Sequence, residues 1–445
     1  MTTTPVAPRP ATYREVFAVG QFRVLFGSYT LFLIGETVRM LALSVAVYAA
    51  TGSPLMSALA YAAGFLPYAL GGTLLLAFAD RWPPRTVMIG YEVLRAAVSA
   101  VLAAGLLPVP AMLALVFVTG LPSAVASASR TALLPDLLDG DRYVLGRAVF
   151  SMAAGGTQVL GFAAGGMLIA AVGAPGALWI TAATCLASAG LLHLRLADHP
   201  RRRTGGTAGI SETWQVNRAL LGRPAVRSLL LAQWLAPALM VGAEGVLVPY
   251  AAQAGVPDAA GLLFAAVAAG MFAGNLIVGR LVRPADRERL AGPLALALGL
   301  PLLGFALRPA PGYAAILLAV SGFGVAYQLA LARRFLDAVP ETQRGQAFGL
   351  LLTGTMTLQG LAAAAGGALG EAAAPGLVVS LAGAASAIAA LTSWRTLSPT
   401  PRKPSVTSVW PIGRRCPPVC RRGARQRPAR DRGACSCPGG RRRTG

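Results

Sequence analysis

Long apolar runs separated by short polar stretches follow one another along most of this 445-residue chain. A helix that crosses a lipid bilayer needs about 20 consecutive, mostly apolar residues, and these runs approach or exceed that length. Glycine and proline recur inside the runs, which membrane helices tolerate because neighbouring helices satisfy the freed backbone groups. The pattern predicts about twelve spans, at residues 22–49, 54–79, 86–107, 111–135, 145–171, 175–194, 226–253, 258–281, 289–308, 312–336, 345–371 and 375–394.

The longest polar stretch between two spans lies near the middle of the chain and leaves six spans on either side. Equal halves indicate a duplicated architecture, so we expect an all-α membrane protein built from two pseudo-symmetric six-helix bundles. Within the stretch, Glu212 to Leu221 predicts a short amphipathic helix on the membrane surface. The expected organisation is a cytoplasmic N-terminal segment (1–21), an N-terminal bundle (22–194), a cytoplasmic linker loop (195–225), a C-terminal bundle (226–394) and a disordered basic tail (395–445).

The composition excludes a soluble domain. Only 13% of the residues are charged and 55% are hydrophobic, whereas soluble domains carry about 25% charged residues. A soluble core of this composition would have to hide apolar runs on every side. The chain starts with a polar segment, and the apolar run after it is longer than the core of a cleavable signal peptide. We therefore expect that run to be a retained membrane anchor.

The net charge of +22 is concentrated in a few segments. From Arg395 onward, fourteen Lys or Arg face a single acid, Asp431, and we interpret this tail as disordered because its composition cannot bury a core. Most of the remaining basic charge falls in loops on one side of the predicted membrane, and arginine-rich loops are typically cytoplasmic. The charge therefore predicts a multi-pass inner-membrane protein with both termini in the cytoplasm and no nucleic-acid partner. The loop arginines are Arg81, Arg85, Arg142, Arg147, Arg201, Arg202, Arg203, Arg280, Arg283, Arg287, Arg289 and Arg344.

Residue patterns typical of enzymes do not occur in the sequence. The two histidines, His193 and His199, flank one loop, and the cysteines of the tail lack the paired Cys-x-x-Cys spacing of a zinc site. No phosphate-binding Gly-x-x-x-x-Gly-Lys-Ser/Thr motif is present, and Lys403 is the single lysine. We therefore expect no enzyme activity, no metal and no cofactor.

A few ionisable residues fall inside the predicted spans, where a charge costs about 2.5–3.5 kcal/mol on insertion scales. Glu36 lies near the middle of the first span, and a carboxylate there can bind a proton, a cationic substrate or both in alternation. The alternative is a structural pair with Arg39, three residues further on the same helical face. Arg130 lies in the last turns of the fourth span, where it can be a counter-ion or can extend to the membrane surface.

Five uncharged polar side chains also fall inside apolar spans. Such groups more often form hydrogen bonds between helices than contacts with a substrate, and we expect the same here. These residues are Gln158, Gln233, Asn275, Gln328 and Gln359.

Several short motifs, in order along the chain, resemble one family. The loop Ala77–Arg85 is similar to the signature loop of the major facilitator superfamily, with Asp80, Arg81 and Arg85 matching and Leu76 and Pro83 at its two glycine positions. The remaining motifs resemble the branch of this superfamily that contains drug exporters similar to the macrolide efflux proteins. They are Phe22–Phe26, Gly35-Glu36, Thr51–Ser53, Glu92–Arg95, Ala132–Asp136 and Gly161–Gly166.

The resemblance implies the major facilitator fold, in which two six-helix bundles rock about a central cavity lined by the first span. By the same resemblance, Glu244 in the seventh span faces that cavity from the other half, unless it is a solvated carboxylate at the rim. Gly161, Gly165 and Gly166 are expected to pack the fifth span closely against a neighbour, although Phe162 stands where the antiporter motif usually has proline. A charge network at the cytoplasmic ends of spans two to four is expected to form a gate, with Arg81 and Arg85 alternatively setting topology alone. Its members are Asp80, Arg81, Arg85, Glu92, Arg95 and Asp136.

The sequence and the resemblance together predict a secondary transporter that exports small amphipathic compounds, such as drugs or secondary metabolites, in exchange for protons. Glu36, Arg39, Arg130 and Glu244 are the expected substrate- and proton-binding residues. The expected partners are a small-molecule substrate and the lipid bilayer, and the protein is expected to be a monomer. One alternative is uptake of a small nutrient, and another is a membrane sensor or scaffold that does not transport.

Overall fold

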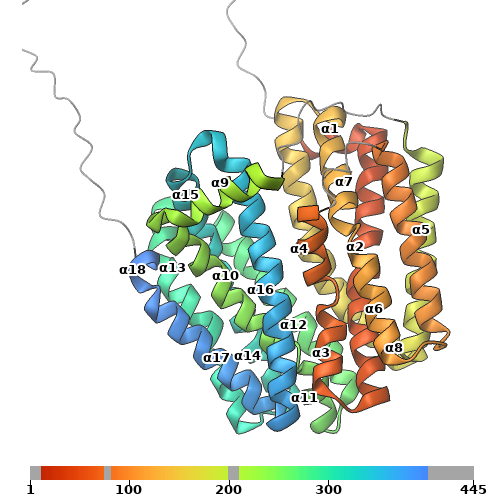
Figure 1. The fold of residues 1–445 in the computed structure, drawn as a ribbon, viewed down its shortest axis with the longest axis vertical. Coiled ribbons are helices and arrows are strands. Elements are labelled where there is room, and N and C mark those ends of the chain that lie inside the picture. Colours follow the sequence, from red (N-terminus) through yellow and green to blue (C-terminus); the bar gives the residue numbers. More distant parts are fainter. Residues whose placement is uncertain (1–11, 75–81, 199–209, 399–445) are drawn as a thin grey trace, which may run out of the picture. The chain divides into compact units, whose positions relative to one another are not determined.

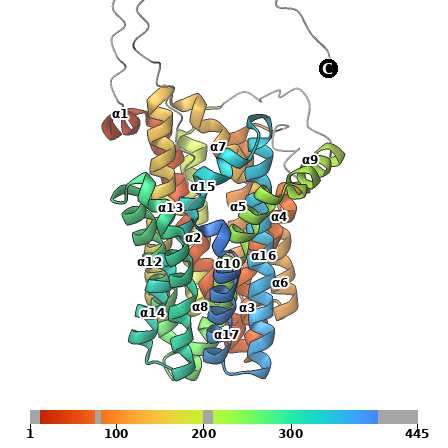
Figure 2. The same cartoon turned by 90° about the vertical axis from the view of Figure 1, so that its left-hand side faces the viewer.

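A computed structural model describes residues 12–74, 82–198 and 210–398, and every regular element in these ranges is helical. Figure 1 shows the helices of the first half beside those of the second, and Figure 2 shows the long helices running side by side. The first half contains α1 (Tyr13–Ala18), α2 (Gly20–Thr51), α3 (Pro54–Ala62), α4 (Phe65–Leu74), α5 (Pro84–Ala103), α6 (Val109–Gly120), α7 (Ser123–Leu137) and α8 (Gly140–Arg195). The second contains α9 (Ile210–Gly222), α10 (Pro224–Glu244), α11 (Leu247–Gln253), η2 (Pro257–Ala259), α12 (Ala260–Arg280), α13 (Pro284–Gly299), η3 (Leu300–Leu307), α14 (Pro311–Gly324), α15 (Tyr327–Ala338), η4 (Glu341–Gln343), α16 (Arg344–Ala372), α17 (Pro375–Thr392) and α18 (Trp394–Leu397).

In the described residues, ten helical segments are long and apolar enough to cross a membrane. One of them, α8, consists of two helices that meet at Gly173 and accounts for the fifth and sixth predicted spans. Counting α8 as two spans, and α3 with α4 as one more, brings the ten segments to the twelve that the hydrophobic pattern predicts. The structure therefore confirms the predicted all-α membrane fold.

Backbone chemistry explains where the helices turn. Gly173 has a φ angle of +73°, a conformation that costs glycine little because glycine has no Cβ, and the chain reverses direction there. Proline begins α3, α5, α10, α14 and α17. The first turn of a helix accepts proline because the N–H that proline lacks would have no partner within the helix.

Several predicted spans are interrupted, which the hydrophobic pattern did not indicate. The second predicted span breaks between α3 and α4, the fourth between α6 and α7, and the seventh between α10 and α11. Pro122 lies at the break between α6 and α7, where its missing N–H removes a helical hydrogen bond. Hydropathy depends on the length of an apolar run and not on whether the helix is continuous, so it cannot predict these breaks.

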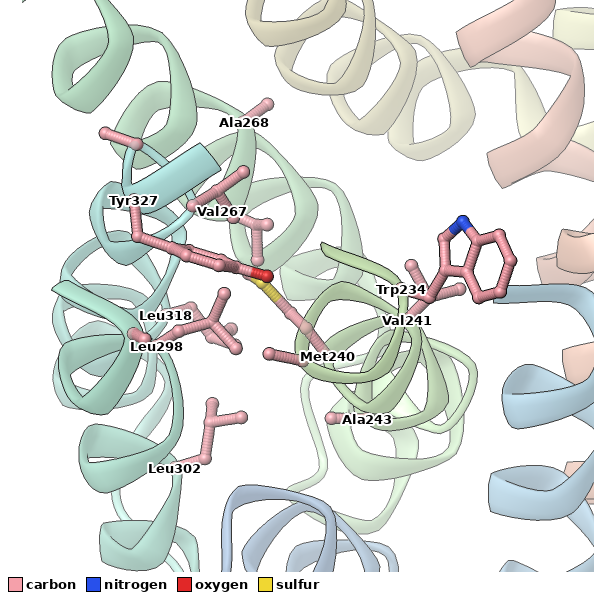
Figure 3. Close-up of a cluster of buried hydrophobic side chains, with 14 of the residues drawn as sticks. Trp234, Met240, Val241, Ala243, Val267, Ala268, Leu298, Leu302, Leu318 and Tyr327 are labelled. Atoms are coloured by element: carbon pink, nitrogen blue, oxygen red, sulfur yellow. The ribbon is translucent and has the colours of Figure 1, made fainter. Parts of the chain in front are cut away.

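The helices of the first half and those of the second half are packed by different kinds of contact. Small polar residues join the helices of the first half: the hydroxyls of Ser28 and Ser188 lie 3.0 Å apart between α2 and α8, and those of Ser44 and Ser57 lie 2.9 Å apart between α2 and α3. In the second half, buried apolar side chains from α10, α12, α13, η3, α14 and α15 form a core (Figure 3). Small residues allow close helix approach in membranes, whereas large apolar side chains fill the space between helices that lie further apart.

The predicted linker contains α9, which covers the expected amphipathic segment. The helices of both halves belong to one compact unit that ends at Pro399. The rest of the predicted tail, and most of the N-terminal segment over 1–21, lie outside the described residues.

Candidate functional site

A cavity of about 820 Å³ lies between the two halves. Its walls come from α2 and α8 of the first half and from α12 and α15 of the second. Most of the lining is apolar, including Leu33, Met152, Met271 and Phe272, and Glu36 is its one acidic residue. At one end the lining reaches Arg280, which is exposed at the end of α12. Small-ligand sites are typically concave, mostly apolar and supplied with a few polar groups, and this cavity has that character.

Three of the five polar residues that the sequence assigned to helix contacts line this cavity. They are Gln158 on α8, Asn275 on α12 and Gln328 on α15. Gln233 is buried and donates to the carbonyl of Leu229, 3.4 Å away within its own helix. Gln328 also makes the expected helix contact, because its Nε2 donates to the carbonyl of Gln233 on α10, 3.4 Å away. Gln158 and Asn275 face the space between the bundles, because the rotation of each helix decides which side chains reach it.

Aromatic and glycine residues close the half of the molecule that lies away from the arginine-rich loops. We call this the outer half, since those loops are predicted to be cytoplasmic. The ring centroid of Phe264 lies 5.0 Å from that of Tyr61 and 5.1 Å from that of Phe162, which joins α12 to α3 and α8. A Cβ added to Gly166 would lie 2.7 Å from the Cα of Gly261. The two bundles therefore touch through their backbones in the outer half and leave the cavity in the inner half.

The glycines of the fifth span all lie at helix contacts. A Cβ at Gly161 would overlap the side chain of Thr37 on α2, and one at Gly165 would meet Val38 and Leu41 on the same helix. Gly161 and Gly165 therefore pack within the first half, whereas Gly166 packs against the second half.

Among the described residues, Glu244 and Glu371 of the second half accept hydrogen bonds from the first half in the closed outer region. The Tyr61 hydroxyl donates to Glu244, with an O–O distance of 2.5 Å. Glu371 on α16 accepts from the Ser53 hydroxyl and from the Leu55 N–H, the latter at 3.0 Å, and so it caps the first turn of α3. Charged acceptors at the start of a helix stabilise it because the first N–H groups have no partner within the helix.

Glu244 lies in a different place from the one predicted. It is buried, with 7% of its surface exposed, so it is not a solvated carboxylate at the rim. It does not line the central cavity either. The sequence contained no signal for its partner Tyr61, which is 183 residues away.

A cluster of five charged side chains lies beside the central cavity, on α2, α5 and α7. Glu36 accepts from both Arg39 and Arg95, and the Arg95 contact measures 3.0 Å. Arg95 also donates to Glu92 at 2.9 Å, and an Arg130 Nη2 atom lies 3.7 Å from Glu92. Arg95, Arg130 and Glu92 are at most 4% exposed. Buried charges are stable only when they are paired and hydrogen-bonded, which explains why these residues gather at one point.

Two of these arginines lie against the ring of Phe32. The guanidinium carbon of Arg95 is 4.4 Å from the Phe32 ring centroid and that of Arg130 is 4.7 Å from it, while Tyr29 lies 5.2 Å from Arg130. Aromatic faces attract cations, most strongly where water is excluded. Arg130 is thus held inside the bundle and does not extend to the membrane surface, which corrects that alternative.

The predicted gate residues do not form one group in the described part of the chain. Arg85, at the start of α5, donates to the His193 carbonyl at the end of α8 and pairs with Asp198 at 2.7 Å. Asp136 lies in the last turn of α7, and Asp80 and Arg81 lie outside the described residues.

Glu92 and Arg95 were expected at the cytoplasmic ends of their spans, and the structure corrects this placement. They lie two to three turns inside α5, about 12–17 Å from its start, beside Glu36. Because α5 extends inward from the signature loop, Glu92 and Arg95 lie in the charged cluster and not beside that loop.

Comparisons with known proteins agree with this architecture. The sequence model of the Major Facilitator Superfamily matches residues 25–336. A chloramphenicol resistance protein of Streptomyces lividans is 32% identical over 288 residues, which cover 61% of this chain and 68% of that protein.

Solved structures share the fold at low sequence identity. A POT family transporter in complex with 5-aminolevulinic acid superposes with a TM-score of 0.67 at 11% identity, covering 85% of this chain and 98% of that one. A bacterial homologue of the human lysosomal transporter Spinster, in an inward-facing and unoccupied conformation, superposes with a TM-score of 0.56 at 16% identity, covering 87% and 95%. The chain therefore belongs to the major facilitator superfamily, and it is a multi-pass membrane transporter of small molecules rather than an enzyme.

Proposed function

We propose that the protein exports small amphipathic compounds in exchange for protons, by alternating access. The observation that carries the proposal is the position of Glu36, a carboxylate in the wall of a mostly apolar cavity between the two bundles. A carboxylate in such a cavity can exchange a proton and can contact a substrate, so it can couple the two.

The efflux direction and the substrate class rest on the relative and on the chemistry of the cavity. The Streptomyces lividans relative is named as a chloramphenicol resistance protein, and export is a common way for a transporter to confer resistance. The lining combines apolar side chains with the uncharged polar groups of Gln158, Asn275 and Gln328. Such a surface favours uncharged or weakly charged compounds that have both apolar and hydrogen-bonding parts.

The partners of Glu36 support the proposed coupling. When Glu36 is ionised, Arg39 and Arg95 both donate to it. A proton on Glu36 would neutralise the carboxylate and weaken its contacts with Arg39 and Arg95. Because Arg95 lies on α5 and Glu36 on α2, the protonation of Glu36 and the position of α2 relative to α5 would then depend on each other. A transporter needs such a two-state contact, whose balance a proton or a substrate can shift by a few kcal/mol.

The remaining predicted roles fit the same proposal. Glu244 and Tyr61 would hold the outer half closed, and Arg130 would balance Glu92. Arg85, Asp136 and the signature loop would act at the cytoplasmic entrance. The arginine-rich loops support an inner-membrane protein with this entrance in the cytoplasm.

Drug susceptibility in an efflux-deficient bacterial host tests the proposal, with chloramphenicol as the first compound of a broad panel. We expect the wild type to raise the inhibitory concentration of at least one compound. Glu36→Gln, which keeps the size of the side chain but not its charge, should abolish this protection. Glu341→Gln is the matched control, because that side chain is 84% exposed and pairs only with its neighbour Arg344 in the described residues.

Two outcomes would contradict the proposal. If well-expressed wild type protects against no compound, export is wrong, and accumulation of labelled nutrients then separates uptake from a protein that does not transport. If Glu36→Gln protects as well as the wild type does, Glu36 is not the coupling residue.

An uncoupler that collapses the proton gradient should raise the accumulation of labelled drug in wild-type cells to the level of cells without the protein.

A further inference from the structure

The helix α9 presents two faces of different character. Its inner face packs onto the second half, where Leu220 is fully buried and Val216 and Leu221 lie against the apolar core. A hydrogen bond adds to this packing, because the Asn217 carboxamide accepts from Gln346 of α16 at 2.9 Å. These contacts fix the rotation of α9 and decide which of its side chains remain exposed.

The opposite face of α9 combines an aromatic ring with a charge. Trp214 is 70% exposed, and Arg218, one turn later on the same side of the helix, is exposed as well. Figure 1 shows α9 running obliquely across the long helices, and in Figure 2 it projects beyond them at one side. A tryptophan and an arginine on the outside of a membrane protein are typical of the bilayer–water interface, where the indole ring enters the headgroup region and the guanidinium meets phosphates.

The start of α10 continues this surface. Arg223 immediately precedes the helix, Arg227 lies one turn into it, and both are exposed. Leu231 and Leu235 follow Arg227 at intervals of one turn and are 41% and 37% exposed, and neither lines the central cavity. Exposed leucines on a membrane-spanning helix face lipid acyl chains, so Arg227 lies where the apolar region ends and the headgroups begin.

The exposed side chains of α9 and of the start of α10 form one surface, which we call the α9–α10 patch: Trp214, Arg218, Arg223 and Arg227. The sequence from Trp214 to Arg227 contains no acid, and Glu212, the nearest acid along the chain, precedes this segment in the first turn of α9. Among the described residues, none of the three arginines makes an ion pair, whereas the exposed Arg289 and Arg344 each pair with an acid three residues earlier. The patch therefore carries positive charge that no described side chain compensates.

We propose that the α9–α10 patch binds an anionic phospholipid of the leaflet beside the arginine-rich loops, which is predicted to be the cytoplasmic one. The guanidinium groups donate to the phosphate oxygens of the headgroup, whose geometry suits their planar fork. The Trp214 ring and the exposed leucines of α10 contact the glycerol backbone and the acyl chains. The patch lies on the second half alone and contributes no residue to the central cavity, so the proposal goes beyond the proposed export function and does not require it.

Isothermal titration calorimetry on the full-length protein in an uncharged detergent tests the proposal. The probe is dioctanoyl phosphatidylglycerol, and dioctanoyl phosphatidylcholine is the matched lipid without net charge. We expect phosphatidylglycerol to bind at least about tenfold more tightly, because each arginine beside anionic headgroups contributes roughly fivefold in affinity. Glycerol phosphate, which has the phosphate but no acyl chains, should bind at least about tenfold more weakly than phosphatidylglycerol.

Two sets of variants locate the binding. Replacing the three arginines of the patch with glutamine should weaken phosphatidylglycerol binding by about tenfold or more, and replacing them with lysine, which keeps the charge, by less than about threefold. The matched control removes three other exposed arginines from the same predicted side, through Arg142→Gln, Arg147→Gln and Arg283→Gln. Because these lie outside the patch, their loss should change the affinity by less than about twofold. All the replaced side chains are exposed, so the variants should fold.

Several outcomes would overturn the proposal. Equal affinity for the two lipids, or an equal loss in the two sets of glutamine variants, would mean that the patch does not select an anionic headgroup. If glycerol phosphate binds as tightly as phosphatidylglycerol, the patch is a site for free phosphate and not for a lipid. If the lysine variant loses as much affinity as the glutamine variant, or if the wild type binds no phosphatidylglycerol up to about 1 mM, the proposal is also wrong. The measurement involves no transport, so its failure leaves the export proposal untouched.

Discussion

The two halves of this transporter differ in what lies buried inside them. The first half buries Arg39, Glu92, Arg95 and Arg130 around Glu36, whereas Glu244 is the one charged residue counted as buried in the described part of the second half. The second half is filled instead by large apolar side chains. In Figure 3, Tyr327 and Met240 point toward each other, and Leu298, Leu302 and Leu318 lie alongside.

This difference indicates a division of labour between bundles of similar architecture. Apolar packing is insensitive to protonation, so the second bundle is suited to move as a rigid body and to form one wall of the cavity. A network of buried charges responds to a proton or an ion because each member depends on its partners. We therefore expect substitutions in the first half to alter stability and transport together, and substitutions in the core of the second half to alter stability alone.

Replacing Arg95 with glutamine should give the largest effect. The change removes a partner from both Glu36 and Glu92 and leaves buried carboxylates uncompensated, which typically costs about 3–5 kcal/mol of unfolding free energy. Unfolding of the purified protein in mixed micelles measures the loss, and drug susceptibility measures function. Arg289→Gln, at a 76% exposed side chain of the second half, should cost less than about 0.5 kcal/mol. An equal loss of unfolding free energy in Arg95→Gln and Arg289→Gln would show that the charged cluster does not stabilise the first half.

Gly166→Ala tests the contact between the two halves. The added methyl group would meet the backbone of Gly261, so it should destabilise the closed outer half by about 1–3 kcal/mol. In a cysteine-free background, a cysteine at the buried Ala58 should then react faster with a thiol reagent that does not cross membranes. Gly190→Ala in the second helix of α8, where a Cβ meets nothing within 4 Å, should leave the rate unchanged. A rate that does not change in Gly166→Ala would show that this contact does not hold the outer half closed.

Tyr327→Phe tests whether the apolar core of the second half affects stability without affecting transport. The Tyr327 hydroxyl donates to the carbonyl of Ala232 over 2.6 Å in the apolar core. Its loss should lower the unfolding free energy by about 1 kcal/mol and leave drug resistance intact. Tyr313→Phe, at a side chain that is 70% exposed, provides the control and should change neither quantity. Loss of resistance in Tyr327→Phe without loss of stability would mean that the second core also takes part in the transport cycle.

Glu371→Gln should give the smallest effect. The amide can still accept from Ser53 and from the Leu55 N–H, but without the charge that strengthens both bonds. Because Glu371 is exposed to solvent, we expect the labelling rate at the same Ala58→Cys site to rise only about two- to fivefold. Glu341→Gln is again the control. A larger increase than that in Gly166→Ala would place the main outer contact at Glu371 instead of at the glycines.

The sequence by itself determined the features that depend on neighbouring residues. The length and spacing of apolar runs predicted the helical membrane fold, because the bilayer requires about 20 apolar residues per span whatever surrounds it. The pair Glu36 and Arg39 was predictable, because residues three apart lie on one face of a helix. The family was visible from short motifs in their order along the chain.

Only the tertiary structure decided which distant residues meet. Glu36 and Arg95 are 59 residues apart. The sequence pattern indicated neither the contact of Arg130 with the Phe32 ring nor the hydrogen bond between Tyr61 and Glu244. These contacts depend on how each helix is rotated about its axis and where it breaks. Rotation and breaks are set by the packing of all the neighbouring helices together, whereas hydropathy reports each helix alone.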